Sequence, residues 1–323
     1  MLRAVCRAVV AFAFATGVAV AAYPDRPIRI IVPFPAGAGN DLLGRMIGQK
    51  LSVALGQPVV IENRAGAAGN IGTEVAATAA PDGYTLLVIN NAQTMNQALD
   101  PKVRFDVVRD FVGVAMVAAS PMLLVSSNDF PAKSVPELVA YAKANPGKVN
   151  FGSSGYGTPQ QFGAEMLSGM AGIKMTHVPY RGQAPSNAAL VTNEIQIAFG
   201  TVAGFAPLVK AGRIRPIAAA GNTPPKEFPL LPTVGQSYPG FSIYIWYGLV
   251  APAATPAPIV KLLSDEIGKI MANPVNRAEF EEKGFEVTPA SGEALTGFIK
   301  NDLSQWKTVV QQGKLTPPEG ETQ

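Results

Sequence analysis

A short loop of small residues follows the first β-branched run of the chain and leads into a helical pattern. Its sequence over residues 33–41 is Pro-Phe-Pro-Ala-Gly-Ala-Gly-Asn-Asp. Backbone N–H groups that face outward from such a loop, at the start of a helix, favour a bound anion. A plain strand-to-helix turn would also explain the pattern. The candidate ligand-binding residues here are Phe34, Ala36, Gly37 and Ala38.

Asn40 or Asp41 is expected to cap this helix, because such side chains accept hydrogen bonds from free N–H groups at a helix start. A carboxylate at this place repels an anionic ligand. We therefore expect either a ligand with a donor group beside its carboxylate or a bridging water. Asp41 is included among the candidate ligand-binding residues.

A second loop, over residues 152–157, combines hydroxyl groups with glycine. It leads into Thr158, Pro159 and Gln161, which fit the cap, the first and the third helical positions of a capping box. Hydroxyl and N–H groups would converge at this helix start and could hold a carboxylate without any charged residue. A well-capped helix alone explains the pattern equally well. The candidates here are Ser153, Ser154, Gly155 and Thr158.

Other polar residues near predicted strand ends are weaker candidates. The amide of Asn91 could line a cleft, although a surface turn is the more common setting for it. Tyr180 and Arg181 follow a later strand, and Arg181 would supply a cation near its end. His177 is expected to be a packed histidine rather than a ligand or base. Trp246 could belong either to a cleft wall or to the core.

Strand-like and helix-like patterns alternate along the chain. This alternation predicts an α/β fold with mainly parallel sheets flanked by helices. In such folds ligands bind where the carboxyl ends of strands lead into helix starts. The predicted strands are 28–32, 59–61, 84–89, 121–126, 149–152, 174–178, 195–199 and 214–219, and the main helices are 42–55, 72–80, 135–145, 158–170, 259–271 and 294–311.

The chain of 323 residues is longer than one hydrophobic core usually supports, so two lobes are expected. Two long extended stretches, 113–126 and 242–250, are natural crossings between lobes. We expect residues 22–120 to form the first part of lobe 1, residues 121–250 to form lobe 2, and residues 251–323 to return to lobe 1.

The first 21 residues have the pattern of a secretory signal peptide. Arg3 and Arg7 precede an apolar run that is too short to span a bilayer, and Ala19-Val20-Ala21 fits a cleavage site. The mature protein is therefore expected in the periplasm. Cys6 is the only cysteine and lies in this leader, so the mature chain can form no disulfide or cysteine metal site.

Charge and residue types exclude several function classes. The chain has 26 Lys and Arg, two of them in the leader, against 23 Asp and Glu. This near-neutrality argues against a nucleic-acid surface. With one histidine and no mature cysteine, the chain has few of the side chains that metal sites and catalytic triads need. We expect a monomeric protein that is not an enzyme and binds no cofactor and no metal.

The chain resembles the Bug-type solute-binding receptors of tripartite tricarboxylate transporters over essentially the whole mature length. Any one matching segment is a weak signal, whereas their order and spacing together are specific. The resemblance implies a two-lobe periplasmic-binding-protein (Venus-flytrap) architecture that hands a small carboxylate solute to membrane permease subunits. The matching segments are 26–35, 62–66, 69–72, 81–87, 131–134, 152–158, 176–182 and 246–252.

The resemblance also implies how a ligand is held. Ligands of the family include dicarboxylates, citrate-like acids, acidic amino acids, nicotinate and aromatic acids, bound by backbone groups and waters from segments that match 34–41 and 153–158 here. Many relatives carry an acidic residue just after the strand that ends here at Phe199, whereas this chain has Gly200 and Thr201. Thr201 is therefore a further candidate, and the missing acid disfavours an amino-acid ligand.

An α/β enzyme that binds a dinucleotide is the alternative. Gly37 and Gly39 follow a strand, and Glu62 ends the next one about 20 residues later, as a ribose-binding acid would. Leu42, however, stands where the fingerprint needs glycine or alanine, and export would remove the protein from cytosolic nicotinamide pools. The Gly152 loop is no nucleophile elbow, because Tyr156 occupies its last glycine position.

Overall fold

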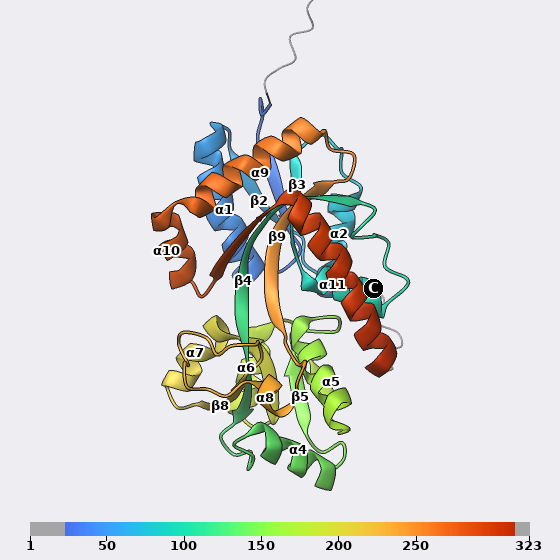
Figure 1. Ribbon diagram of the computed structural model, residues 1–323, viewed down its shortest axis with the longest axis vertical. Helices are drawn as coiled ribbons and strands as arrows, with labels where there is room; N and C mark the ends of the chain where they lie inside the picture. The colour runs from blue at the N-terminus through green and yellow to red at the C-terminus, as the bar shows by residue number, and fades with distance from the viewer. Residues whose placement is uncertain (1–22, 314–323) are drawn as a thin grey trace, which may run out of the picture.

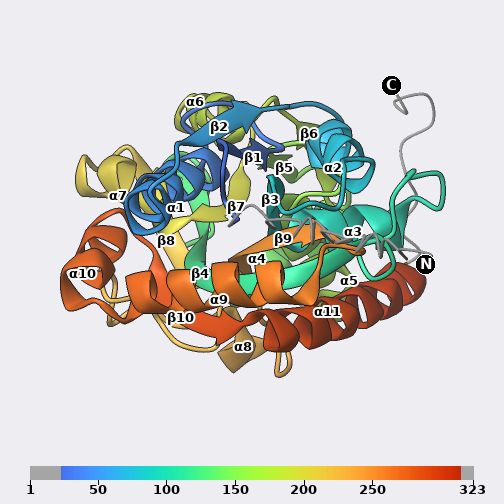
Figure 2. The same ribbon diagram turned by 90° about the horizontal axis from the view of Figure 1, so that it is seen from above.

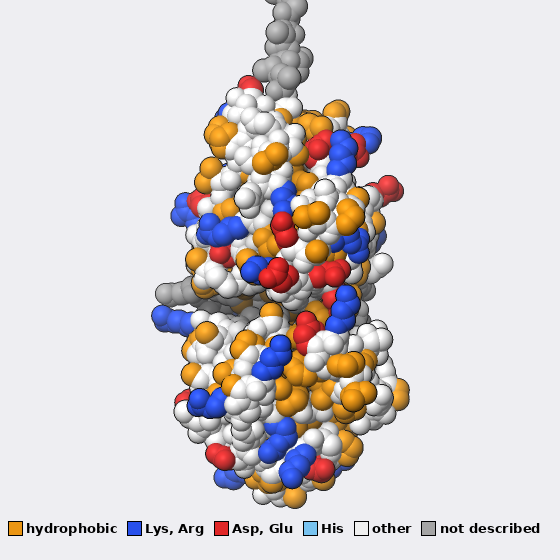
Figure 3. Space-filling model, turned by 90° about the vertical axis from the view of Figure 1, so that its left-hand side faces the viewer, with side chains coloured by type: hydrophobic (Ala, Val, Ile, Leu, Met, Phe, Trp, Pro, Cys, Tyr) orange, Lys and Arg blue, Asp and Glu red, His pale blue; other side chains and the backbone are white. Residues whose placement is uncertain are grey.

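The computed structural model describes residues 23–313, and the expected signal peptide lies outside this range. The described chain forms two α/β lobes stacked along the long axis of the molecule and joined by two long strands (Figure 1). A waist separates the two lobes in the space-filling view (Figure 3).

Three parallel strands form the centre of the first lobe. They are β1 (Ile28–Val32), β2 (Val59–Asn63) and β3 (Thr85–Asn90). β1 lies between the other two and pairs in parallel with both. Ile28, Ile30 and Ile31 of β1 are fully buried. A parallel strand covered on both faces needs apolar residues on each, which explains the unbroken β-branched run.

The second lobe repeats this arrangement. β5 pairs in parallel with both β6 and β7. Helices α4 to α8 surround the sheet, at the bottom of Figure 1. The elements are α4 (Val135–Ala144), β5 (Asn150–Ser153), α5 (Pro159–Ala171), β6 (Thr176–Pro179), α6 (Gln183–Val191), β7 (Ile197–Thr201), α7 (Val202–Lys210), β8 (Ile214–Ala219) and α8 (Val234–Ser237).

Two strands cross between the lobes. They are β4 (Phe111–Ser127) and β9 (Tyr244–Pro252), which pair antiparallel. The first part of β4 also pairs with β10 (Glu286–Ser291), and its last part pairs with β7 and β8. β9 continues into the first sheet beside β3. One strand therefore belongs to both sheets, and the expected lobe boundary at residues 120 and 121 lies inside it.

Helices cover the first lobe on both faces. They are α1 (Gly39–Leu55), the short η1 (Ala67–Gly69), α2 (Asn70–Ala77), α3 (Asn91–Leu99), α9 (Ala257–Ala272), α10 (Pro274–Glu282) and α11 (Gly292–Gly313). α1 buries Leu43, Ile47 and Leu51 on one face, as the helical spacing predicts. Figure 2 shows α9, β10 and α11 together on the side opposite to β2 and α6.

The α/β class is confirmed, but the sheets are mixed rather than mainly parallel. Among the named strands of residues 23–313, parallel pairing is confined to β1, β2 and β3 in one lobe and β5, β6 and β7 in the other. The crossing strands pair antiparallel with their neighbours because each returns the chain between lobes. Over the described range, the helices are too short or too polar for any to traverse a lipid bilayer.

Candidate functional site

Helix starts gather at one edge of each sheet. β1 and β5 each end in a loop that leads into a helix, α1 and α5, and β6 and β7 lead into α6 and α7. The carboxyl ends of parallel strands lie at the same edge, so the N–H groups of these starts share it. The edges of the two lobes meet where Gly157, after β5, lies against Asn96 of α3.

The first loop is closed by Asp41. Its carboxylate accepts hydrogen bonds from the Gly37 N–H at 2.9 Å, Arg45 Nε at 3.0 Å and Asn63 Nδ2 at 2.9 Å. Burial opposes ionisation, but hydrogen bonds from Arg45, Gly37 and Asn63 outweigh it and hold the pKa of Asp41 below its usual value. The negative charge is thus compensated inside the protein, which removes the expected repulsion of an anion.

The expected cap of α1, Asn40 or Asp41, is wrong by two or three residues. The helix begins at Gly39 with Ala38 as its cap, so Asn40 and Asp41 lie in the first turn. From the first turn, the Asp41 carboxylate accepts a hydrogen bond from the Gly37 N–H in the preceding loop. Ala36 and Gly37 are exposed at the tip of the loop, where their backbone is accessible to a ligand.

Residues far away in sequence support this loop, and sequence reasoning did not identify them. Asn63 Nδ2 also donates to the Phe34 carbonyl oxygen at 3.1 Å. The Tyr247 hydroxyl, from crossing strand β9, lies 2.8 Å from the point where a Cβ on Gly39 would stand. Phe34 itself is half-buried, with its ring against Gly69. The loop is therefore held by β2, β9 and η1 together.

The second loop is organised around Ser153. Its buried Oγ donates to the Gly155 carbonyl oxygen at 2.9 Å and accepts from the Gly155 N–H at 3.0 Å. Thr158 Oγ1 donates to the same carbonyl oxygen at 2.7 Å. Gly155 has a φ of 122°, which favours glycine. The half-buried Ser154 lies at the turn that these bonds fix.

The predicted capping box at α5 is wrong in its bonds, although the helix begins as expected. Thr158 stands at the cap, but its side chain accepts no hydrogen bond from the first turn. Thr158 instead donates back to Gly155, and Gln161 Oε1 accepts from the Gly157 N–H at 2.8 Å. The Thr158 side chain thus stabilises the loop and does not cap the helix.

His177 packs beneath this loop. Its Nε2 lies 2.6 Å from Ser153 Oγ, and its ring stacks on Phe151 with centroids 4.9 Å apart. Burial lowers the pKa of His177 to about 4, so the imidazole is neutral. No acid in the described chain contacts the buried Nδ1, which a catalytic Ser-His pair would need for orientation. The expectation of a packed histidine is confirmed.

The weaker candidates take different positions. The surface turn expected at Asn91 is wrong, because Asn91 begins α3, is 1% exposed and donates to the Tyr244 carbonyl oxygen at 2.8 Å. The half-buried Tyr180 donates from its hydroxyl to Glu194 at 2.8 Å, whereas Arg181 is exposed. These residues therefore do not all meet at one point.

Thr201 lies at the start of α7 and faces a residue that the sequence analysis missed. Its Oγ1 accepts from the Gly204 N–H at 3.3 Å and donates to Gln183 Oε1 at 3.1 Å. Gln183 Nε2 is buried and meets no acceptor among the described residues. Gln183 directly follows the Tyr180-Arg181-Gly182 segment, so its position after a strand was the available signal.

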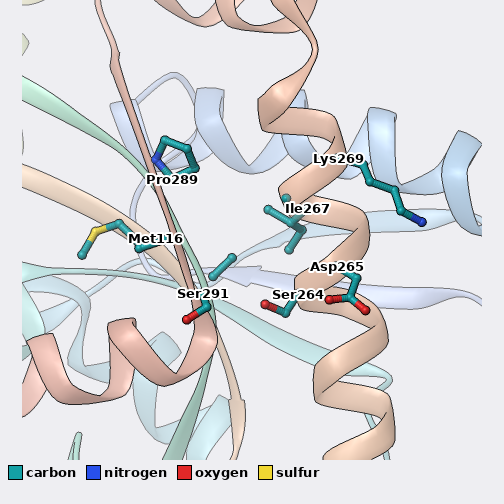
Figure 4. A pocket seen from close by; sticks show the side chains of 10 residues that line it. Met116, Ser264, Asp265, Ile267, Lys269, Pro289 and Ser291 are labelled. Atoms are coloured by element: carbon teal, nitrogen blue, oxygen red, sulfur yellow. The ribbon is translucent and has the colours of Figure 1, made fainter.

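A cavity lies away from these loops. It has a volume of about 480 Å³ and is bordered by α9, β4 and β10, with Ser264, Ser291 and Met116 among its lining residues (Figure 4). Asp265 and Lys269 at its edge already pair with Lys261 and Glu266. Residues 23–313 contain no group of three His, Cys, Asp or Glu side chains placed to hold a metal ion.

The chain is similar in sequence to a known receptor family and to known proteins. Residues 43–315 match the model of the tripartite tricarboxylate transporter family receptor. The protein BugT of Bordetella pertussis is 31% identical over 293 residues, which cover 90% of each chain.

Two solved structures are similar over almost their whole length. The R. palustris protein Rpa4515 with adipate has a TM-score of 0.85 at 28% identity, covering 92% of this chain and 100% of that one. MatC from Rhodopseudomonas palustris with bound malate has a TM-score of 0.81 at 28% identity, covering 89% and 100%. Since the family model spans most of the sequence, this chain belongs to the tripartite tricarboxylate transporter family of receptors.

Proposed function

We propose that this chain is a periplasmic receptor that captures a small carboxylate between its lobes and passes it to transporter permease subunits. One observation carries the proposal: two loops of small residues lead into helix starts, with their backbone N–H groups, on the meeting edges of the lobes. Asp41 is the only acidic residue in these loops, and Arg45 and Asn63 compensate its charge. Preorganised neutral donors of this kind suit a carboxylate.

The proposed ligand is a dicarboxylate, a tricarboxylate or an aromatic acid. Adipate and malate, named with two similar structures, are small dicarboxylates. An amino acid would need an acceptor for its ammonium group, but Asp41 is already engaged and Thr201 carries no charge. The proposed contacts come from Phe34, Ala36, Gly37, Ala38, Asp41, Asn91, Ser153, Ser154, Gly155, Thr158, Tyr180, Arg181 and Thr201.

The proposal excludes catalysis and nucleotide binding. The dinucleotide alternative has no support, because Leu42 stands in α1 where close approach of a pyrophosphate needs a small residue. We further propose cleavage of the leader 1–21 and a monomeric mature protein. The proposed lobes are residues 22–120 with 251–323, and residues 121–250.

Calorimetry on the protein without its leader tests this assignment. The titrants are adipate, malate, citrate and benzoate, with aspartate and a nicotinamide dinucleotide for comparison. We expect saturable binding of at least one plain or aromatic carboxylate and none of the dinucleotide. Binding of the dinucleotide without any carboxylate would contradict the proposal.

Gly157→Ala should weaken binding of the tightest of these carboxylates by roughly tenfold or more. A Cβ at Gly157 would overlap the side-chain amide of Asn96, and the φ of 71° already disfavours a side chain. The substitution therefore pushes the second loop away from α3. Calorimetry gives the affinity, and scattering should show a larger radius of gyration.

Two controls separate this contact from backbone strain. Gly147 has a similar φ of 75° and nothing within 4 Å of its Cβ position, so Gly147→Ala should leave affinity unchanged. Asn96→Ala combined with Gly157→Ala should recover much of the lost affinity. Equal losses in Gly147→Ala and Gly157→Ala would show that the contact between the lobes has no role.

A further inference from the structure

A small second cavity opens between the start of β9 and α11. It has a volume of about 110 Å³, and four of its ten lining residues are aromatic: Tyr244, Trp246, Phe298 and Trp306. Trp246 and Phe298 meet edge to face, with ring centroids 5.3 Å apart. Tyr244 is the exposed member of this set, so the cavity is reached from the surface.

The floor of this cavity is negative. Asp302 is 8% exposed, and none of the ion pairs found in residues 23–313 involves it. Its Oδ2 accepts from the Thr94 hydroxyl at 2.5 Å. Neither indole N–H, from Trp246 or Trp306, meets an acceptor with regular hydrogen-bond alignment, so both act on this carboxylate as nearby dipoles. Burial of an unpaired carboxylate costs free energy. A bound cation would therefore stabilise this site.

A second acceptor in the cavity wall is also free. Asn91 is 1% exposed; its Nδ2 donates to the Tyr244 carbonyl oxygen, while no described residue donates to its Oδ1. Aromatic faces, a carboxylate and an amide oxygen are together the groups that hold an organic cation. Anions and apolar molecules would leave both acceptors unpaired.

We propose that this cavity binds a small organic ammonium ion, held by the Asp302 carboxylate, Asn91 Oδ1 and the surrounding aromatic rings. The site lies outside the two loops of the carboxylate site and shares only Asn91 with the contacts proposed there. Since β9 crosses between the lobes and Trp306 packs on Phe162 of α5, an ion bound here lies beside the connection between the lobes.

Tryptophan fluorescence gives a direct test, because Trp246 and Trp306 are the only two tryptophans in the chain. The probe is tetramethylammonium chloride, added to the leaderless protein at constant ionic strength. We expect a saturable change in emission that sodium chloride, potassium chloride and the neutral tert-butanol do not produce. A response to potassium alone, or none to tetramethylammonium, would overturn the proposal.

Three variants assign the response to this cavity. Asp302→Asn should weaken tetramethylammonium binding at least roughly tenfold, because it removes the only charge in the wall while keeping its shape. Phe298→Leu should weaken it several-fold, about the loss of one cation–π contact. Glu293→Gln, an exposed carboxylate in the same helix, should bind as the wild type does. Unchanged affinity in Asp302→Asn would contradict the assignment.

Discussion

Ser153→Ala should lower both the stability of the protein and its affinity for the carboxylate. The buried Oγ makes contacts with Gly155 O, Gly155 N and His177 Nε2. Their loss leaves His177 without a partner at either ring nitrogen. We expect a loss of roughly 2–3 kcal/mol in the free energy of unfolding, as removal of a buried hydrogen-bonding group gives. Affinity should fall more than about tenfold, since the loop loses its fixed shape.

Ser126→Ala is the matched control. Ser126 is a fully buried serine of the same lobe, on β4, and its Oγ has no partner in the described chain. The same atom is therefore removed from an equally buried site without the loss of a hydrogen bond. Urea unfolding and calorimetry compare the two variants. Equal effects would mean that the Ser153 contacts do not organise the loop.

Asp302→Asn should stabilise the protein at neutral and alkaline pH. Burial raises the pKa of Asp302 to about 6, although Thr94 and the two indole groups favour its ionised form. The ionised carboxylate therefore costs stability above about pH 6. The rise of this pKa from its usual 3.8 to about 6 corresponds to roughly 3 kcal/mol as an upper bound. Asparagine fills the same space without this cost.

The pH dependence has a definite sign. Because the folded protein holds the proton of Asp302 more tightly than the unfolded chain, the cost disappears as the pH falls from about 6 toward 3.8. Urea unfolding at about pH 8 should favour the variant by roughly 1–3 kcal/mol, with the difference nearly gone at about pH 4. Glu293→Gln should show no such dependence. A variant less stable than the wild type at about pH 8 would contradict this account.

Local patterns in the sequence predicted much of the fold. The positions of β1, α1, β5 and α5 follow from runs of apolar residues and from glycine and proline between them. Both loops that lead into α1 and α5 were predicted for the same reason. The capping box was predicted at the wrong helix: the structure has one at Asn90 and Gln93, in the segment assigned to a turn.

The contacts that hold the loops could not be predicted, because they join distant parts of the chain. Asn63 lies 22 residues from Asp41, and Tyr244 lies 153 residues from Asn91. A repeating pattern indicates that a residue is buried but not which residue it faces. The compensated charge of Asp41 and the buried position of Asn91 both arise from such contacts. They changed the interpretation of two candidate residues.

A crystal structure of the leaderless protein with the tightest-binding carboxylate tests the central claim most directly. The account predicts the ligand between the lobes, with its oxygens bonded to donors of both the 34–41 and the 153–158 loops. Asp41 should remain paired with Arg45, as it is in this structure. A carboxylate bound beside α9 and β10, or held by one lobe alone, would contradict the account.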